Sequence, residues 1–296
     1  MKRILFVCHG NICRSPMAEF ILKDIVKKYD MEEEFIIASA ATSTEEIWNG
    51  IGNPVYPPAQ KELAKYKISC EGKRAVQMRR EDYDNYDILI GMDDRNIANM
   101  KRIAGGDPDQ KIKKLLSFAG DSGDIADPWY TGDFEKTYED IVRGCNGFLR
   151  QPCNEALLQA VKDGDEELAK KRFWQTIICY QGYQFRTMSG LPFSYTIKRG
   201  RNGELTKELW VDRRENSKSL SWGSLSQAFS SAFRMKEANR PKSLGDIRGV
   251  SYIYPMLWKF GVLQVPKEIE ETMSGEKASK TSDNTSENTS ANESIQ

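Results

Sequence analysis

Short apolar runs that alternate with longer amphipathic segments constrain the fold of the first 150 residues most strongly. The apolar runs lie at residues 3–8, 35–40, 87–92 and 111–118. Amphipathic segments follow at residues 15–29, 59–67, 93–104 and 134–149, and residues 43–59 form an irregular stretch rich in Gly and Pro. This alternation is typical of β-α-β units. It predicts an α/β fold for residues 1–150, a doubly wound four-stranded parallel sheet of the Rossmann-like type.

A different pattern begins beyond Pro152 and predicts a second, small α+β domain at residues 151–272. A polar helix at residues 154–181 precedes a β-hairpin that turns at Asn202-Gly203. Ser219 or Ser221 then caps another helix. Basic side chains outnumber acidic ones from residue 174 to 267, although the formal net charge of the whole chain is zero. Residues 273–296 have almost no apolar content, which predicts a disordered tail.

The chain has no sequence signal for export or for a membrane. No apolar run approaches the roughly 18 residues of a membrane span. The apolar run after Met1 is shorter than the roughly 7–15 residues of a secretory signal. The six cysteines are scattered, so a disulfide framework is not expected. These features predict a cytoplasmic protein without a membrane partner.

The stretch VCHGNICRSP, residues 7–16, places two cysteines and the only histidine of the chain between the first apolar run and the first helix. Structural zinc needs a second ligand pair downstream, so we expect no metal and no cofactor. The spacing is not that of a redox Cys-x-x-Cys motif. His9 is adjacent to Cys8 and is poorly placed as its general base. The remaining interpretation is a loop that binds an anion.

A loop between a strand and a helix N-terminus presents backbone N–H groups to a phosphate-sized anion. Arg14 can close this cradle with a bidentate contact, and Ser15 can donate a hydrogen bond to Cys8. The positive field should favour the Cys8 thiolate. Gly10 and Asn11 tolerate the left-handed backbone that such loops use. The expected phosphate-binding residues, besides Arg14, are His9, Gly10, Asn11, Ile12, Cys13 and Ser15.

Residues 1–150 resemble the low-molecular-weight protein tyrosine phosphatases, in particular the bacterial members. The signature Cys-x5-Arg-Ser of that family stands here as Cys8 to Ser15. Its second signature, Asp-Pro followed by two aromatic residues, stands as Asp127-Pro128-Trp129-Tyr130. Between them, DYDNYDILIGMDDRNI at residues 82–97 is similar to the family's third strand with its Met92-Asp93 pair.

The resemblance implies a hydrolase that acts on tyrosine phosphate in a protein or on a small aryl phosphate. Cys8 would form a phosphocysteine, Arg14 would bind phosphate, and Asp127 would be the general acid and base. Trp48, Trp129 and Tyr130 would line the substrate cleft. Cys13 would form a reversible disulfide with Cys8 or would be a core thiol, and these two readings remain open.

Other activities of the same fold are less well matched. Arsenate reductases need two further cysteines after the third strand, and residues 91–107 contain none. Arginine phosphatases carry threonine where this chain has Ile12, and the bulkier apolar side chain fits the tyrosine-directed members better. In a separate departure from the family, Lys73 replaces a histidine that is common in related sequences, so no role of that histidine is carried over. A phosphate-sensing binding protein is a further alternative, although it would have no use for Asp127. The domain at 151–272 is expected to dock a protein or a nucleic acid, or to be a scaffold.

Overall fold

The computed structural model describes residues 1–201, 205–212 and 218–275. The chain divides into two compact units, Met1–Leu149 and Arg150–Gln296. The boundary lies inside a single helix, α6, which spans Phe134–Asp163. We describe each unit by itself.

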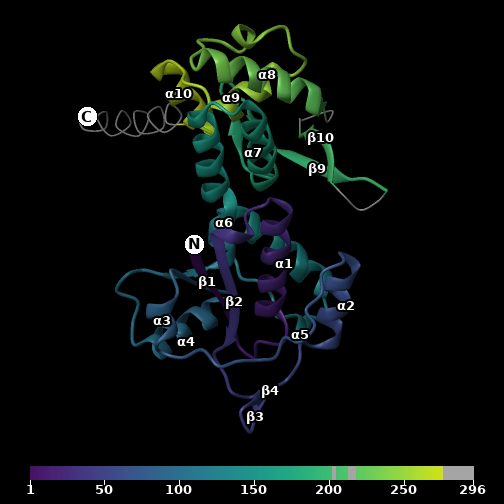
Figure 1. The fold of residues 1–296 in the computed structure, drawn as a ribbon, viewed down its shortest axis with the longest axis vertical. Helices are drawn as coiled ribbons and strands as arrows, with labels where there is room; N and C mark the ends of the chain where they lie inside the picture. The colour runs from purple at the N-terminus through teal and green to yellow at the C-terminus, as the bar shows by residue number, and fades with distance from the viewer. Residues whose placement is uncertain (202–204, 213–217, 276–296) are drawn as a thin grey trace, which may run out of the picture. The chain divides into compact units, whose positions relative to one another are not determined.

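The first unit is built on a four-stranded parallel sheet (Figure 1). Its strands are β1 (Lys2–Cys8), β2 (Phe35–Ala41), β5 (Ile88–Gly91) and β6 (Ile112–Lys114), in the spatial order β2-β1-β5-β6. All pairs are parallel. The expected α/β fold class is confirmed. The helices are α1 (Arg14–Lys28), α2 (Pro57–Lys65), α3 (Asp82–Asn85), α4 (Asp94–Ala104), α5 (Pro128–Thr131) and α6, with 3-10 helices η1 (Glu32–Glu34) and η2 (Leu115–Ala119).

The central strand β1 is buried on both faces. Leu5 and Val7 pack in one apolar cluster with Met100 of α4. Ile4 and Phe6 alternate with them along the strand, so they face the other side of the sheet, and both are fully buried. This burial fixes the register of β1 and therefore the position of Cys8 at its carboxyl end.

The fourth strand is shorter than the sequence indicates. We expected a strand over residues 111–118, but β6 ends at Lys114 and residues 115–119 form η2. Leu115 packs directly on Gly144 of α6, where an added Cβ would lie 2.5 Å from Leu115 Cγ. The chain turns here to make that close approach, so the strand cannot continue.

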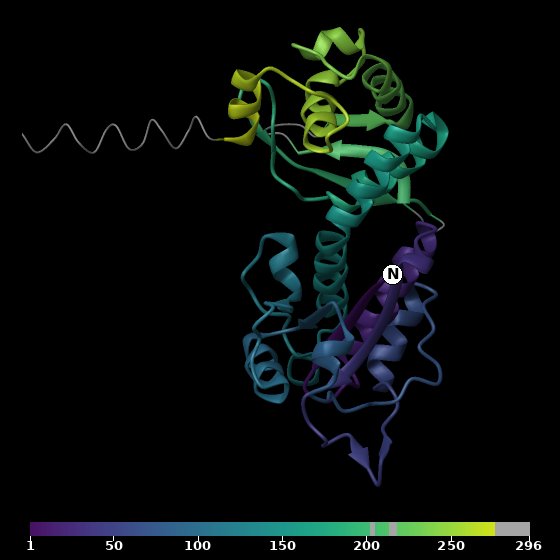
Figure 2. The same cartoon turned by 60° about the vertical axis from the view of Figure 1, so that its left-hand side comes forward.

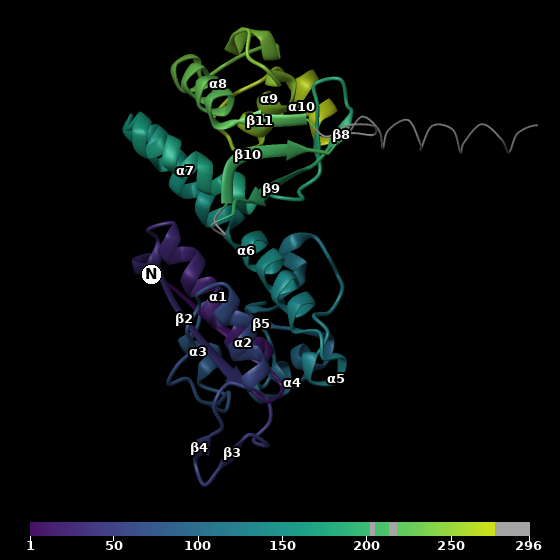
Figure 3. The ribbon, with the colours of Figure 1, turned by 90° about the vertical axis from the view of Figure 1, so that its right-hand side faces the viewer.

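The irregular stretch rich in Gly and Pro contains a small hairpin that we did not expect. β3 (Ile47–Trp48) pairs with β4 (Ile51–Gly52) in an antiparallel ladder. Asn49 and Gly50 form the turn with φ of 51° and 78°, the positive values that a two-residue hairpin turn requires. The hairpin projects from the first unit in all three views (Figures 1, 2 and 3).

The second unit has an α+β composition, which agrees with the expected class. Its antiparallel sheet has the order β11-β10-β9 and can be followed in Figure 3. Ser221, one of the two expected caps, accepts a hydrogen bond from the Ser224 amide at the start of α8. The elements after α6 are α7 (Glu166–Cys179), β7 (Phe185–Arg186), β8 (Pro192–Phe193), β9 (Tyr195–Arg199), β10 (Leu205–Val211), β11 (Lys218–Ser221), α8 (Trp222–Met235), η3 (Pro241–Leu244), α9 (Val250–Lys259) and α10 (Lys267–Ser274).

Two helix predictions in this part of the chain are wrong in detail. The helix expected to end near Leu149 continues through Pro152 to Asp163. The helix expected over residues 154–181 is broken at Gly164, which has a φ of 76°, and Asp165 caps α7. Glycine in this conformation ends one helix while the aspartate satisfies the free amides of the next.

Two further predictions touch the residues that the structure does not describe. The Asn202-Gly203 turn lies outside the described residues, although β9 and β10 do pair antiparallel on either side of it. The tail was expected from residue 273, but Met273 is buried in α10, so the helix extends to Ser274. Residues 276–296 lie outside the described part. Within that part, no helix is both long and apolar enough to span a membrane.

Candidate active site

Cys8 ends β1, and α1 begins six residues later at Arg14, so the intervening loop lies at the carboxyl edge of the sheet. The Cys8 side chain is buried. Its sulfur accepts a hydrogen bond from the Asn11 amide at 3.3 Å and lies 3.0 Å from Ser15 Oγ. The loop therefore places a backbone N–H donor and a hydroxyl against the Cys8 sulfur.

Asn11 determines the shape of this loop. It has a φ of 56° and is completely buried. Its Nδ2 donates to Ser15 Oγ and to Ser39 Oγ, both at 2.8 Å, and its Oδ1 accepts the Val76 amide at 3.1 Å. These bonds hold a left-handed asparagine that would otherwise be strained. Gly10 does not have the left-handed backbone that we expected. A side chain at this position would be crowded instead, because an added Cβ would lie 3.0 Å from Glu46 Cγ.

A series of buried polar side chains is hydrogen-bonded to Asn11 through Ser39. Ser39 Oγ donates to Glu19 Oε2 at 2.6 Å, and the same carboxylate oxygen pairs with Lys73 at 2.8 Å. Burial alone would raise the pKa of Glu19, but the charge of Lys73 and hydrogen bonds from Lys23, Lys73 and Ser39 outweigh it, so the pKa is lowered. A carboxylate only accepts, so the Ser39 hydroxyl must donate to it and present its oxygen to Asn11.

Replacing Lys73 by methionine should lower the free energy of unfolding at pH 7 by about 2 kcal/mol, because buried Glu19 would lose one of its two cations. The Glu19 pKa is lowered in the fold, so its contribution is present above about pH 4.5 and is lost as the pH falls through the folded-state pKa. Urea unfolding should show the largest gap between Lys73→Met and wild type near neutrality. Exposed Lys61, replaced by methionine, is the control; an equal effect there would contradict the prediction.

Arg14 closes the loop and connects it to two other segments. Its side chain is 4% exposed. NH1 donates to Asp93 Oδ2 at 2.6 Å and to the Ile125 carbonyl at 3.0 Å, and NH2 donates to Asp127 Oδ2 at 2.5 Å. Burial would lower the pKa of Arg14, but Cys8, Asp127 and Asp93 together raise it. The guanidinium therefore stays charged beside the thiol.

Asp127 lies beside Arg14 although 113 positions separate them in the sequence. Its Oδ1 accepts the Trp129 amide at 3.1 Å, so the carboxylate also caps the short helix α5. Asp93 was not among our expected site residues. It caps α4 through the Asn96 amide and directly follows β5 and Met92. The carboxyl ends of parallel strands meet at one edge, and this was the signal that could have placed Asp93 with Cys8.

The expected cleft aromatics are exposed but are not all in contact with one another. Trp48, Trp129 and Tyr130 expose 70%, 54% and 85% of their surface. Trp129 packs on Tyr56 with a centroid distance of 4.9 Å. Tyr56 also donates its amide to the Ile12 carbonyl at 2.8 Å. Tyr56 therefore joins the Cys8 loop to the segment that follows Asp127, a contact that the sequence did not indicate.

The side chains of His9 and Cys13 have different surroundings. His9 Nε2 lies 2.9 Å from Glu45 Oε2, and both side chains are well exposed. Cys13 is buried in a small cluster with Ile12 and Ala75. Burial chiefly, together with the charge of Cys8, raises the pKa of Cys13. Cys13 is therefore a protonated thiol at neutral pH, and its pairing with Cys8 remains a prediction.

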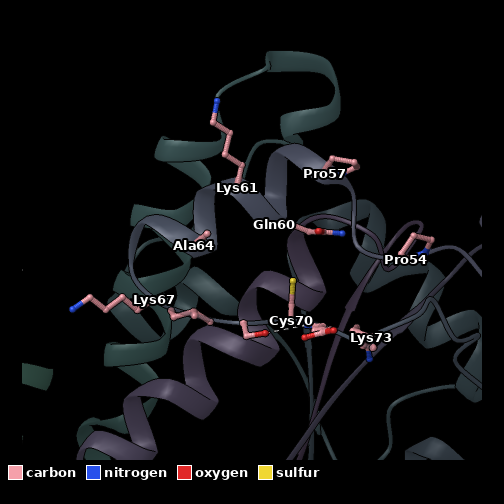
Figure 4. A pocket seen from close by; sticks show the side chains of 12 residues that line it. Pro54, Pro57, Gln60, Lys61, Ala64, Lys67, Cys70 and Lys73 are labelled. Atoms are coloured by element: carbon pink, nitrogen blue, oxygen red, sulfur yellow. Dashed lines mark hydrogen bonds between the residues drawn. The ribbon is translucent and has the colours of Figure 1, made fainter.

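A separate groove of about 850 Å³ lies beside α2 and contains none of the residues discussed as catalytic. Figure 4 shows the Cys70 sulfur pointing into it below Gln60, whereas Lys61 and Lys67 extend away from Cys70. The lysines therefore do not converge on a common ligand position. Among the described residues, no cluster of three or more His, Cys, Asp or Glu side chains is arranged to hold a metal.

The fold and the loop place a thiol and a buried guanidinium in one strand-loop-helix segment of a parallel α/β sheet. A family model described as low molecular weight phosphotyrosine protein phosphatase matches residues 3–163, more than half of the chain. The chain belongs to this family. The expected enzyme class, a protein-tyrosine-phosphatase, is confirmed at this level.

Individual relatives cover the first half of the chain. The low molecular weight protein-tyrosine-phosphatase YfkJ of Bacillus subtilis is 40% identical over 151 residues, which are 50% of this chain and 94% of that protein. The crystal structure of a Streptococcus pyogenes low molecular weight protein tyrosine phosphatase matches with 39% identity and a TM-score of 0.45, over 51% of this chain and 93% of that chain. A Drosophila arginine phosphatase structure matches with 28% identity and a TM-score of 0.46, over 51% and 97%.

Proposed function

We propose that the protein hydrolyses tyrosine phosphate through a phosphocysteine on Cys8. The observation that carries the proposal is the meeting of Cys8, Arg14 and Asp127 at one edge of the sheet. In the first step the Cys8 thiolate forms a bond to phosphorus, the bond to the phenolic oxygen breaks, and Asp127 gives that oxygen a proton. In the second step Asp127 takes a proton from water, which attacks phosphorus and releases Cys8 and inorganic phosphate.

Arg14 and the loop amides would hold the oxygens of the transferring phosphoryl group. Asp93 and the Ile125 carbonyl fix NH1 of Arg14, so NH2 is the nitrogen that exchanges Asp127 for a phosphate oxygen. That exchange frees the Asp127 carboxyl to reach the leaving oxygen. Because Arg14 and the amides supply the positive field, the proposed reaction needs no metal or cofactor.

We favour phosphotyrosine over phosphoarginine because the exposed aromatic residues offer an apolar surface to the leaving group, and because Ile12 stands where the arginine phosphatases of this fold carry threonine. The apolar side chain of Ile12 packs against Cys13 and Ala75. Exposed Trp48, Trp129 and Tyr130 suit a phenyl ring, whereas a guanidinium would have to lose its hydration there.

Wild-type enzyme should therefore cleave a phosphotyrosine peptide with a kcat/KM about 100-fold higher than the same peptide carrying phosphoarginine, measured by phosphate release. The Ile12→Thr variant should narrow that ratio, because it puts a hydroxyl in place of the apolar side chain that packs on Cys13 and Ala75 in the Cys8 loop. A reversed preference in the wild type would support the arginine phosphatase alternative, and an equal preference would contradict the predicted selectivity.

We further propose that residues 1–150 are the catalytic domain and that residues 151–272 dock a protein or nucleic acid partner through their excess of basic side chains. All six cysteines are free thiols, which suits a reducing compartment such as the cytoplasm. Asp127 disfavours the alternative of a binding protein that only senses phosphate. Asp127 is the second carboxylate beside Arg14, so it weakens the attraction of Arg14 for a phosphate. Such a carboxylate is useful only to an enzyme that transfers a proton.

A further inference from the structure

Exposed apolar side chains lie on the β3-β4 hairpin and on the segment that is hydrogen-bonded to the Cys8 loop. Trp48, Ile51 and Val76 expose 70%, 63% and 49% of their surface. We call these three residues the apolar strip. Large exposed apolar surface is unfavourable in water and often marks a place where another molecule binds.

The backbone holds the strip in place. Trp48 and Ile51 are cross-strand partners in the hairpin, so their side chains lie on the same face. Gly52, next to Ile51, packs on Ala75 so closely that an added Cβ would lie 1.9 Å from the Ala75 carbonyl oxygen. The Ala75 amide donates to Asn53 at 2.9 Å. These contacts place Val76, the next residue, beside the hairpin that carries the other two.

The inner end of the strip is bonded to the catalytic loop. The Val76 amide donates to Asn11 Oδ1 at 3.1 Å, and the Val76 carbonyl accepts the Ala41 amide at 2.7 Å. Asn11 in turn donates its own amide to Cys8. Val76 is therefore bonded through Asn11 to the loop that holds the nucleophile, while Trp48 and Ile51 lie on the hairpin itself.

We propose that the apolar strip binds apolar side chains that flank the phosphotyrosine of a polypeptide substrate. The proposal rests on the proposed function, and it adds a preference for the residues on either side of the phosphotyrosine. Once a phosphotyrosine enters the cleft, its neighbours lie within about 3.5 Å per residue of it and must pass over the rim. A small aryl phosphate is too short to cover Ile51, whereas an apolar flank would remove the strip from water.

Charges of both signs lie next to the strip. Glu45 and Glu46 directly precede β3, and the side chain of Glu45 is 72% exposed. Glu45 contacts His9, and Glu46 accepts a hydrogen bond from Asn53. Arg74 also lies here and donates a hydrogen bond to the Gly52 carbonyl at 2.9 Å. Because these charges are mixed, the apolar surface of the strip itself is what disfavours a charged flank, which would have to lose its hydration there.

The test compares kcat/KM for three phosphotyrosine peptides that differ only in the two residues on each side of the phosphotyrosine, which are Leu, Ser or Glu, together with phenyl phosphate. For the wild type we expect the Leu peptide to exceed the Ser peptide by about tenfold and the Glu peptide to be the poorest. An enzyme inactive on phenyl phosphate would overturn the proposed function itself. Activity on phenyl phosphate with equal values for the Leu and Ser peptides would overturn the strip proposal alone.

The variant that tests the strip is Ile51→Ser/Val76→Ser, and the readout is the ratio of kcat/KM for the Leu peptide to that for the Ser peptide. We expect this ratio to fall to about one. Ile36→Ser is the matched control, because Ile36 is 40% exposed on β2 near the end of the sheet opposite Cys8; its ratio should stay at about ten. An unchanged ratio in the double variant, or a wild-type dimer that the double variant abolishes without changing the ratio, would overturn the proposal.

Discussion

Replacing Cys8 by serine is expected to lower kcat for phenyl phosphate by about 10⁴-fold or more. The serine hydroxyl occupies the same position between the Asn11 amide and Ser15 Oγ, but it does not ionise near neutral pH and is a weak nucleophile without a general base. No histidine is placed to act as that base, because His9 lies against Glu45. The loss should appear in kcat, since Arg14 and the loop amides that bind phosphate remain.

Two measurements distinguish loss of the nucleophile from loss of the fold. Acid-quenched wild-type enzyme should carry one covalently bound phosphate on the peptide that contains Cys8, whereas Cys8→Ser should carry none and should still bind inorganic phosphate. Cys70→Ser is the matched control, since Cys70 is also a buried thiol but lies in the separate groove. Full activity in Cys8→Ser would refute the assignment of Cys8 as the nucleophile.

The sequence predicted the parts of the site that are contiguous in the chain. Cys8, Asn11, Arg14 and Ser15 belong to one strand-loop-helix segment, and local spacing sufficed to assign them to an anion loop. The buried character of β1 also followed from its apolar run, because a parallel central strand is covered on both faces.

The supporting residues could not be assigned in this way, because their partners are far away in the sequence. Ser39, Glu19 and Lys73 form one chain only after β2, α1 and the segment before α3 are packed together. In the sequence each is an ordinary polar residue. Tyr56 is similar, because its contact with Trp129 bridges 73 positions and depends on how α2 is placed.

The errors in element boundaries have a related cause. Pro152 and the run after Lys114 were judged by local propensity, whereas tertiary contacts decided both. α6 continues through Pro152, and β6 ends because Leu115 packs on Gly144. Local pattern therefore established which elements exist in the first unit, and long-range packing determined where they end.

Replacing Asp127 by asparagine is expected to lower kcat for phenyl phosphate by about 10³-fold, within the 10²–10⁴ range of general acid catalysis. Asparagine keeps an oxygen for the Trp129 amide, so the cap of α5 is retained. It cannot give a proton to the leaving phenolate, whose conjugate acid has a pKa of about 10. The loss should be much smaller for 4-nitrophenyl phosphate, because a more acidic leaving group departs without protonation.

Asp93→Asn provides the contrast that isolates the proton transfer. Asp93 holds the same guanidinium through NH1 but is not proposed to protonate the leaving group. Loosening Arg14 should therefore raise KM and lower the rate by similar factors for both substrates. Asp127→Asn should instead leave KM equal or lower, because NH2 of Arg14 no longer has a competing carboxylate, and should depend steeply on the leaving group. If both variants showed the same dependence on the leaving group, Asp127 would only orient Arg14 and the general acid would have to be another residue.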